Sequence, residues 1–328
     1  MPKLSTARKL GVALRAAKNM AVGRPITVSF EITFNCNANC KHCNWGPYVK
    51  EPRLGPEVWA DRLAELKPAV AQISGGEPLL RKDVYDIIAE MRRRDPLAVF
   101  VFTTNVQLLT EEKYLRLREV GVDEFSFSLD YPDERHNEYR KLKENFEHIR
   151  DLVPRLAQHG HDDIVMACVV QSDNFTELPR IAELAKQWGV KVNFSIYTHL
   201  RSGNTELTIN PNGQLSALIG IIDQLVRMQR DGYPIVTSEY SMRKIIEFYR
   251  TRSMPDCQAG RRFFIINPWG KIAPCGMIQG EYDSQDEIIE KFTKSNRCDQ
   301  CYTAIRANCE KSPKRMVLDA LRALRTRK

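Results

Sequence analysis

The chain is organised around Asn35-Cys36-Asn37-Ala38-Asn39-Cys40-Lys41-His42-Cys43-Asn44-Trp45-Gly46. Three cysteines, Cys36, Cys40 and Cys43, have the spacing C-x3-C-x2-C and follow an apolar run at residues 26–34. Cysteine thiolates are the usual ligands of iron–sulfur clusters. Three of them on one loop can bind three irons of a [4Fe–4S] cube and leave the fourth iron open to a ligand that is not protein. A zinc knuckle is the alternative, although structural zinc sites usually close with four ligands.

The size of the chain and its cysteine content limit the class of protein. The 328 residues, 43% of them hydrophobic, suffice for one large domain with a small one, or for two medium domains. There is no apolar run of about 18 residues that could span a membrane, and the N-terminus lacks the apolar core of a secretory signal. We therefore expect a cytoplasmic, reducing location, in which the nine cysteines are metal ligands rather than disulfides.

Positive charge is concentrated at the two ends of the chain. Residues 1–24 and residues 311–328 each carry a net charge of +6, which leaves the body mildly acidic within a total of +8. No nucleic-acid partner is expected, because such a protein needs basic residues along its body. Basic amphipathic helices are expected at 1–25 and 311–328. They could contact an anionic membrane peripherally or dock a partner, but their narrow apolar faces favour packing on the body.

Apolar, β-rich stretches alternate with amphipathic ones between residues 26 and 200. Strands are expected at 26–33, 69–74, 98–104, 124–129, 163–170 and 190–197. Helices are expected at 56–66, 83–93, 111–120, 146–158 and 177–188, one after each strand but the last. This order predicts an α/β fold with a parallel sheet covered by helices. A G-x-G-x-x-G motif does not follow the first strand, so a dinucleotide fold has no support.

The remaining chain is expected to form a connector and a second module. Residues 201–256 are expected to be a helical connector, with helices at about 214–230 and 240–252. Residues 257–310 contain the other cysteine group, and Asn267 to Lys271 is expected to be the turn of a hairpin within it. Four of its cysteines could close either a [4Fe–4S] site or a zinc site, and spacing does not separate the two.

The second strand is followed by a turn, Ser74-Gly75-Gly76-Glu77-Pro78. Its two glycines permit close approach of the backbone to a ligand, Glu77 offers a carboxylate for an ammonium group, and Pro78 stiffens the turn. Alone, this is an ordinary tight turn. In a parallel barrel, however, it lies beside the cysteine loop, at the carboxyl end of the strands where barrel chemistry occurs.

The cysteine triplet and the Gly75-Gly76-Glu77-Pro78 turn together resemble the radical SAM enzyme family. The resemblance implies a partial (β/α)6 TIM barrel at residues 26–200 and a small C-terminal cysteine-rich iron–sulfur module. It implies that S-adenosylmethionine binds the open iron through its amino and carboxylate groups, with Glu77 and nearby backbone holding the amine. His42 stands where the family usually has an aromatic residue.

Two further stretches extend this resemblance. Ser128 and Arg140 are similar to a Ser-x-Asp and His-x3-Arg pattern in one branch of the family, in which they would contact the ribose or carboxylate of S-adenosylmethionine. An arginine fork suits a carboxylate, but a surface ion pair is an equal alternative for Arg140. Thr104-Asn105 resembles a common end of the third strand, but Val106 replaces the usual glycine.

The C-terminal cysteines are similar to the SPASM and Twitch extensions of radical SAM enzymes. The resemblance implies one auxiliary [4Fe–4S] cluster, ligated by Cys257, Cys275, Cys298 and Cys301, with Cys309 as an alternative or spare ligand. Auxiliary clusters of related enzymes either accept an electron from a product radical or anchor the substrate. An oxidative outcome is therefore favoured, as an oxidoreductase or a C–X or C–C bond-forming enzyme.

The predicted function is reductive cleavage of S-adenosylmethionine to a 5′-deoxyadenosyl radical, which removes hydrogen from a small-molecule biosynthetic intermediate such as a lipid, tetrapyrrole or sugar. A small substrate is favoured because only about 25 residues precede the first strand, too few for a peptide-binding winged-helix module. Flavodoxin or ferredoxin is the expected electron donor. The alternatives are a peptide-modifying SPASM-type maturase and, in another class, a non-catalytic zinc or iron–sulfur binding module.

Overall fold

A computed structural model describes residues 5–46 and 48–312 of the chain. One eight-stranded sheet has the order β6-β5-β4-β3-β2-β1-β7-β8. Its strands are β1 (Thr27–Thr33), β2 (Val70–Gly75), β3 (Val99–Thr104), β4 (Glu124–Ser128), β5 (Ile164–Val170), β6 (Lys191–Ile196), β7 (Phe263–Ile266) and β8 (Ile272–Ala273). All neighbours are parallel except β7 and β8, which form the expected hairpin. The expected parallel α/β fold and partial barrel are confirmed.

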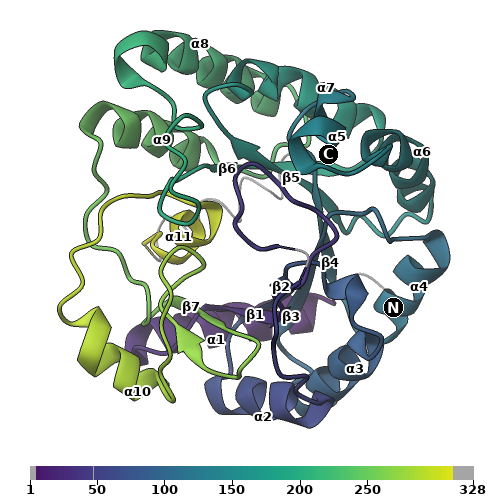
Figure 1. The fold of residues 1–328 in the computed structure, drawn as a ribbon, viewed down its shortest axis with the longest axis vertical. Helices are drawn as coiled ribbons and strands as arrows, with labels where there is room; N and C mark the ends of the chain where they lie inside the picture. The colour runs from purple at the N-terminus through teal and green to yellow at the C-terminus, as the bar shows by residue number, and fades with distance from the viewer. Residues whose placement is uncertain (1–4, 47, 313–328) are drawn as a thin grey trace.

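Most helices lie around the outside of the curved sheet, whereas α11 lies inside the ring that they form (Figure 1). The helices are α1 (Thr6–Val22), α2 (Pro56–Leu66), α3 (Val84–Arg94), α4 (Glu111–Glu119), α5 (Arg135–Arg140), α6 (Asn145–Gln158), α7 (Leu178–Gln187), α8 (Pro211–Arg230), α9 (Glu239–Thr251), α10 (Gln285–Ile288) and α11 (Ala304–Cys309). The expected helices at about 214–230 and 240–252 are present as α8 and α9, and α8 packs against α7. The short helix α5 was missed. The expected C-terminal helix lies almost entirely outside the described residues.

In β1, apolar and polar residues alternate between the two faces of the sheet. In β1, Val28, Phe30 and Ile32 are buried beneath the outer helices, whereas Ser29 and Glu31 face the interior of the barrel and line a cavity. This two-residue alternation follows from the geometry of a strand, whose successive side chains point to opposite faces. The expectation of a continuously apolar strand is confirmed for β5, whose Val165, Ala167 and Val169 also line the cavity. It was wrong for β1, whose inner face is polar.

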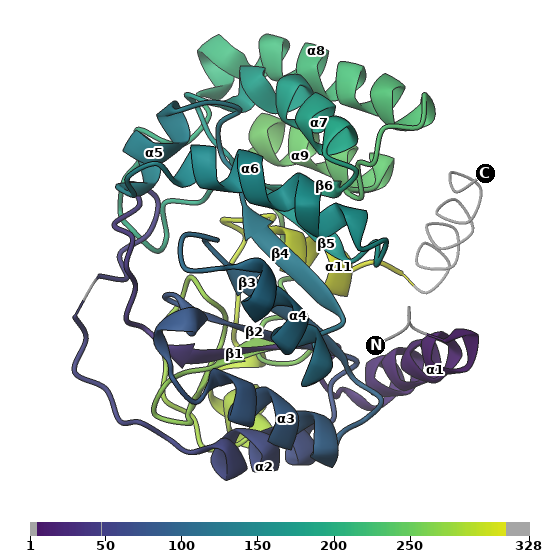
Figure 2. The same ribbon diagram turned by 90° about the vertical axis from the view of Figure 1, so that its right-hand side faces the viewer.

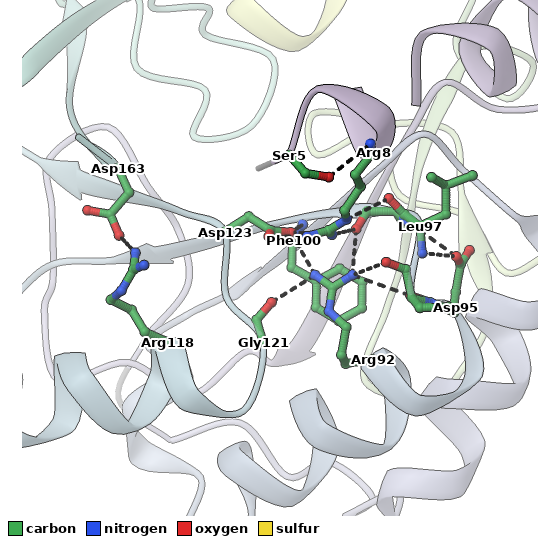
Figure 3. Close-up of polar contacts among 12 residues, drawn as sticks. Ser5, Arg8, Arg92, Asp95, Leu97, Phe100, Arg118, Gly121, Asp123 and Asp163 are labelled. Carbon is green, nitrogen blue, oxygen red and sulfur yellow. Dashed lines mark hydrogen bonds and ion pairs between the residues drawn. The ribbon is translucent and has the colours of Figure 1, made fainter. Parts of the chain in front are cut away.

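Helix α1 closes the end of the barrel opposite the cysteine loop (Figure 2). The Arg8 guanidinium donates to both carboxylate oxygens of Asp123, at 2.6 and 2.8 Å, and Arg92 from α3 binds the same carboxylate (Figure 3). A second ion pair joins Arg15 to Asp95. The expected packing of the N-terminal helix on the body is thus what the structure has.

The C-terminal segment fills the open side of the barrel. Strand β7 pairs in parallel with β1, and α11 contacts both β7 and β6. The backbone N–H of Ala304 donates to Ser195 Oγ on β6 at 3.0 Å. The cysteine-rich segment shares one sheet with the barrel. The expected division into a barrel that ends at residue 200, a connector and a module that begins at residue 257 therefore stays a prediction.

Candidate active site

The first three cysteines lie together in the loop that follows β1. Cys40 is buried with Ala38 and Leu142, and Cys36 and Cys43 pack against the same group. A negative charge on Cys43 would raise the pKa of both Cys36 and Cys40. Burial raises the pKa of Cys40 to about 12. Thiols in this environment ionise readily only beside a cation, and metal coordination supplies one because it deprotonates a thiol outright.

The two glycines of the turn after β2 pack against the start of the cysteine loop. Gly75 has φ +139°, and a Cβ there would overlap the carbonyl oxygen of Thr33. A Cβ at Gly76 would overlap the carbonyl oxygen of Asn35. The backbone N–H of Gly76 donates to Thr33 O at 2.7 Å. The glycines are therefore required for contact between these two loops, in addition to any approach to a ligand.

Glu77 ties this turn to the end of β3. Its fully buried carboxylate accepts hydrogen bonds from Leu79 N at 3.1 Å, Thr104 Oγ1 at 2.8 Å and Asn105 N at 2.8 Å. Burial raises its pKa to about 7 despite these bonds. A carboxylate has about four acceptor positions, so one remains for a further donor. The expected contacts of Glu77 and the neighbouring Pro78 with S-adenosylmethionine stay a prediction.

Arg140 is buried beneath the cysteine loop. Its Nη2 lies 2.7 Å from Asp130 Oδ2, and its Nη1 lies 3.9 Å from Cys40 Sγ. Arg140 therefore forms an ion pair, which was the alternative to contact with S-adenosylmethionine, but the pair is buried and not on the surface. Ser128, two residues before Asp130, lines the cavity. The expected contacts of Ser128 and Arg140 with S-adenosylmethionine stay predictions.

Asn105, His42 and Tyr139 also hold the loop, through contacts that could not be predicted from the sequence. Asn105 Nδ2 donates to Asn37 Oδ1 at 2.7 Å and points at Cys36 Sγ at 3.9 Å. His42 Nδ1 lies 2.6 Å from the hydroxyl of Tyr139, and the two rings stack. Burial lowers the pKa of His42 to about 3. The neutral imidazole therefore replaces the usual aromatic residue as a stacking partner.

Four C-terminal cysteines converge on the other side of the cavity. A charge on Cys301 would raise the pKa of both Cys257 and Cys275, and a charge on Cys298 would raise that of Cys301. Burial raises the pKa of Cys257 to about 11 and that of Cys275 to about 12. The segments that carry them are held by Arg306, a fully buried residue of α11 that donates to the Cys301 carbonyl at 2.8 Å.

Cys309 lines the same cavity and is buried in the cluster against which Cys257 and Cys275 pack. Its Sγ donates to Thr27 Oγ1 on β1 at 3.4 Å. Across residues 5–46 and 48–312, no three His, Cys, Asp or Glu side chains meet closely enough to hold a single metal ion.

One cavity of about 920 Å³ connects the two cysteine sets through the barrel interior. Its wall includes Cys36 and Cys43 at one side, Cys275 and Cys301 at the other, and the Gly75–Gly76 turn between strands. Ligand pockets in proteins have volumes of roughly 300–1,000 Å³. The cavity is therefore large enough for a cofactor and a small substrate between the two sets of thiols.

The fold and this site define a class: a partial α/β barrel with three closely spaced cysteines in the loop at the carboxyl end of its first strand. Residues 30–185 match the family model of the Radical SAM superfamily. This stretch, just under half of the chain, is therefore a radical SAM domain, and the cysteine-rich segment after it is SPASM/Twitch-like. The match implies S-adenosylmethionine and a [4Fe–4S] cluster as cofactors, with an auxiliary cluster as in SPASM-type relatives.

Relatives of different activity match most of the chain. It is 26% identical over 279 residues to an AdoMet-dependent heme synthase of Methanosarcina barkeri, covering 77% of each chain. It is 26% identical over 262 residues to a PqqA peptide cyclase of Granulibacter bethesdensis, covering 76% of this chain and 67% of that protein. Streptococcus suis SuiB bound to S-adenosylmethionine has the same fold, with a TM-score of 0.63 at 15% identity over 92% of this chain and 74% of SuiB. None of the described helices is long and apolar enough to cross a membrane.

Proposed function

We propose that the chain is a radical SAM enzyme that removes a hydrogen atom from a small-molecule biosynthetic intermediate, with an oxidative outcome. The observation that carries this proposal is the single cavity between the two cysteine sets. A substrate in that cavity would lie between the site where a radical forms and the site that can take up an electron. The heme synthase relatives support a small substrate such as a tetrapyrrole, and lipid and sugar intermediates stay open.

In this proposal Cys36, Cys40 and Cys43 bind the first cluster, and Cys257, Cys275, Cys298 and Cys301 bind the auxiliary cluster. The chemistry that a bound, reduced cluster would supply is one electron to the sulfonium of S-adenosylmethionine, whose C–S bond would break to give methionine and the 5′-deoxyadenosyl radical. The protein binds, orients and excludes water. Arg140 and Asn105 direct N–H groups at the thiolates, and the Gly75–Gly76 turn fixes the loop. Flavodoxin or ferredoxin is the proposed electron donor.

A peptide substrate is the second candidate. It is supported by the PqqA peptide cyclase relatives and by the likeness in fold to SuiB, a structure of which contains the precursor peptide SuiA. A peptide would have to enter the barrel from its cysteine-loop end, because α1 closes the other end. The two candidates differ in the size of the substrate, not in the radical chemistry.

Anaerobic reconstitution tests the proposal. Purified protein supplied with iron and sulfide should bind about eight irons, from two four-iron clusters, and should form 5′-deoxyadenosine with dithionite and S-adenosylmethionine. A colourless protein that holds zinc and forms no 5′-deoxyadenosine would instead support a non-catalytic binding module. Deuterium transfer from a labelled metabolite or peptide extract into 5′-deoxyadenosine would then separate the two substrate classes.

We further propose peripheral membrane contact through α1. Leu10 and Leu14 lie one turn apart on its solvent face and are 61% and 63% exposed. Lys9 and Lys18 are exposed beside them. A helix with an apolar stripe and flanking lysines suits the surface of an anionic bilayer.

A further inference from the structure

Polar atoms without partners gather at one place on the cavity wall. Among the described residues, seven buried side-chain nitrogen or oxygen atoms have no hydrogen-bond partner. Three of them belong to residues that line the cavity: Glu31 Oε2, Trp45 Nε1 and Arg201 Nη2. Buried polar groups in proteins are nearly always hydrogen-bonded, because an unmade bond costs free energy. Three such atoms in one cavity therefore point to a ligand that supplies their partners.

Glu31 is the acceptor of this group. It lies on the inner face of β1, it is 5% exposed, and its burial raises its pKa. The guanidinium of Arg201 acts on it in the opposite direction and lowers that pKa. Glu31 Oε2 and Arg201 Nη2 nevertheless each lack a hydrogen-bond partner, and both residues line the same cavity.

Arg201 and Trp45 are the donors. The indole of Trp45 stacks on Phe34 with ring centroids 3.7 Å apart. The Arg201 guanidinium lies over the Trp45 ring, 4.3 Å from its centroid. Arg201 Nε is 3.4 Å from Asn44 Oδ1. The stacking holds the guanidinium in one orientation, which reduces the entropy that a bound anion would have to remove.

The space between these groups is open because residue 276 is glycine. A Cβ built at Gly276 would lie 3.8 Å from Glu31 Oε1 and 3.9 Å from Arg201 Nη1, so both charged groups converge on that position. Its backbone is not in the left-handed region, so the conformation does not require glycine there. The missing side chain instead leaves room between a carboxylate and a guanidinium, next to Cys275 of the auxiliary set.

We propose that Glu31, Trp45 and Arg201 form a subsite for the polar end of the substrate, and that this end carries a carboxylate with an ammonium or hydroxyl group beside it, as in amino acids and hydroxy acids. Arg201 and the indole N–H bind the carboxylate, since a guanidinium matches its planar geometry. Glu31 accepts from the ammonium or hydroxyl. The assignment rests on the proposed function, because only a substrate in this cavity would lie between the two clusters.

Calorimetry on the reconstituted full chain with S-adenosylmethionine tests the subsite. The probes are L-serine, glycolate, acetate and ethanolamine, each titrated to about 10 mM, a range that detects dissociation constants near 1 mM. L-serine and glycolate should bind, acetate should bind about tenfold more weakly, and ethanolamine should not bind. Failure of every probe would overturn the assignment.

Variants connect the binding to the named residues. Arg201→Gln should weaken L-serine binding about 10- to 100-fold, as for loss of a charged hydrogen bond. Glu31→Gln should weaken L-serine but spare acetate. Gly276→Leu should abolish binding of all probes, whereas Gly276→Ala should reduce it only slightly, with the iron content of each variant as the check on folding. Equal affinities in the wild type and Arg201→Gln would overturn the proposal.

Two measurements on the wild-type protein, competition with S-adenosylmethionine and formation of 5′-deoxyadenosine, distinguish failure of the subsite from failure of the proposed radical chemistry. If the probes compete with S-adenosylmethionine, the subsite belongs to the cofactor and the substrate assignment is overturned. If the probes bind without competition but dithionite yields no 5′-deoxyadenosine, the proposed radical chemistry fails while the subsite stands as a carboxylate-binding site. Binding without competition, together with 5′-deoxyadenosine formation, supports both.

Discussion

Arg140 Nη1 lies 3.9 Å from Cys40 Sγ, so a buried guanidinium faces one sulfur of the proposed cluster. The same guanidinium is neutralised by Asp130, with Nη2 at 2.7 Å from Oδ2. Hydrogen bonds and charge near the sulfurs set the reduction potential of an iron–sulfur cluster. The pair is therefore placed to affect electron uptake as well as stability.

Arg140→Gln separates these two effects. The loss of positive charge should lower the reduction potential of the first cluster, because the reduced cluster carries the more negative charge. It should also destabilise the fold by about 3–5 kcal/mol, since the Asp130 carboxylate is left buried and unpaired. Redox titration followed by electron paramagnetic resonance, together with urea unfolding, measures both quantities.

The double variant Arg140→Gln/Asp130→Asn is the matched control. It removes the unpaired charge, so most of the lost stability should return. Only part of the potential should return, because the N–H contact to Cys40 is still missing. An unchanged potential in Arg140→Gln would show that this contact has no influence on the cluster.

The sequence was informative where the chemistry is local and uninformative where the fold creates it. The Cys36–Cys43 spacing and the Gly75–Gly76 turn are short linear patterns, so they could be read directly. Glu31 and Arg201 come together only because β1 and the loop after β6 face one cavity. Sequence spacing cannot predict such a pair. The polar residues that alternate along β1 did indicate that one face of this strand lines a cavity.

Val106 shows a second limit of sequence reasoning. It occupies the position where the family usually has glycine, and its φ of +73° is in the left-handed region. A β-branched residue rarely adopts that conformation. The side chain is fully buried in the main core, and its burial offsets the backbone cost. Packing of this kind cannot be read from one sequence, so the substitution looked only like a departure from the motif.

Single cysteine variants should show how much of the bound iron belongs to each of the two cysteine sets. Cys40→Ala should reduce the iron content from about eight to about four per chain and abolish 5′-deoxyadenosine formation, since the open cluster binds the cofactor. Cys168→Ala is the control, because Cys168 is buried in β5 among core residues and belongs to neither set. Iron analysis and chromatography of the nucleoside product measure the outcome. Undiminished product from Cys40→Ala would contradict the proposed mechanism.

Cys301→Ser and Cys309→Ser distinguish a ligand from a spare cysteine. Cys301 is electrostatically coupled to the other C-terminal thiols, so its substitution should cost about four irons. Cys309 donates to Thr27 Oγ1 instead, so Cys309→Ser should retain about eight. The serine hydroxyl can keep the contact with Thr27, which limits the loss of stability to about 1 kcal/mol. Loss of iron from Cys309→Ser would move Cys309 into the ligand set.

Gly76→Ala should be strongly destabilising although it adds a single methyl group. That methyl would overlap the carbonyl oxygen of Asn35, so the turn must separate from the cysteine loop. We expect a loss of more than about 2 kcal/mol, comparable with other severe backbone conflicts. Gly220→Ala in α8 is the matched control: its Cβ meets no atom within 4 Å, and it should stabilise the protein by about 1 kcal/mol. Urea unfolding of both variants measures the contrast, and equal effects would refute it.

The solvent face of α1 should bind anionic vesicles if the proposed membrane contact exists. Vesicles with about a third of phosphatidylserine should sediment the wild-type protein at low salt and release it as salt screens the lysines. Leu10→Ser/Leu14→Ser should reduce binding more than about 100-fold, because the two leucines together contribute about 3–6 kcal/mol when their side chains leave water. These residues are exposed, so the fold and the iron content should not change.

Lys9→Gln/Lys18→Gln should weaken binding mainly at low salt. Equal sedimentation of all three proteins would exclude α1 as the contact, and the helix would then serve only to close the barrel through its Arg8–Asp123 ion pair.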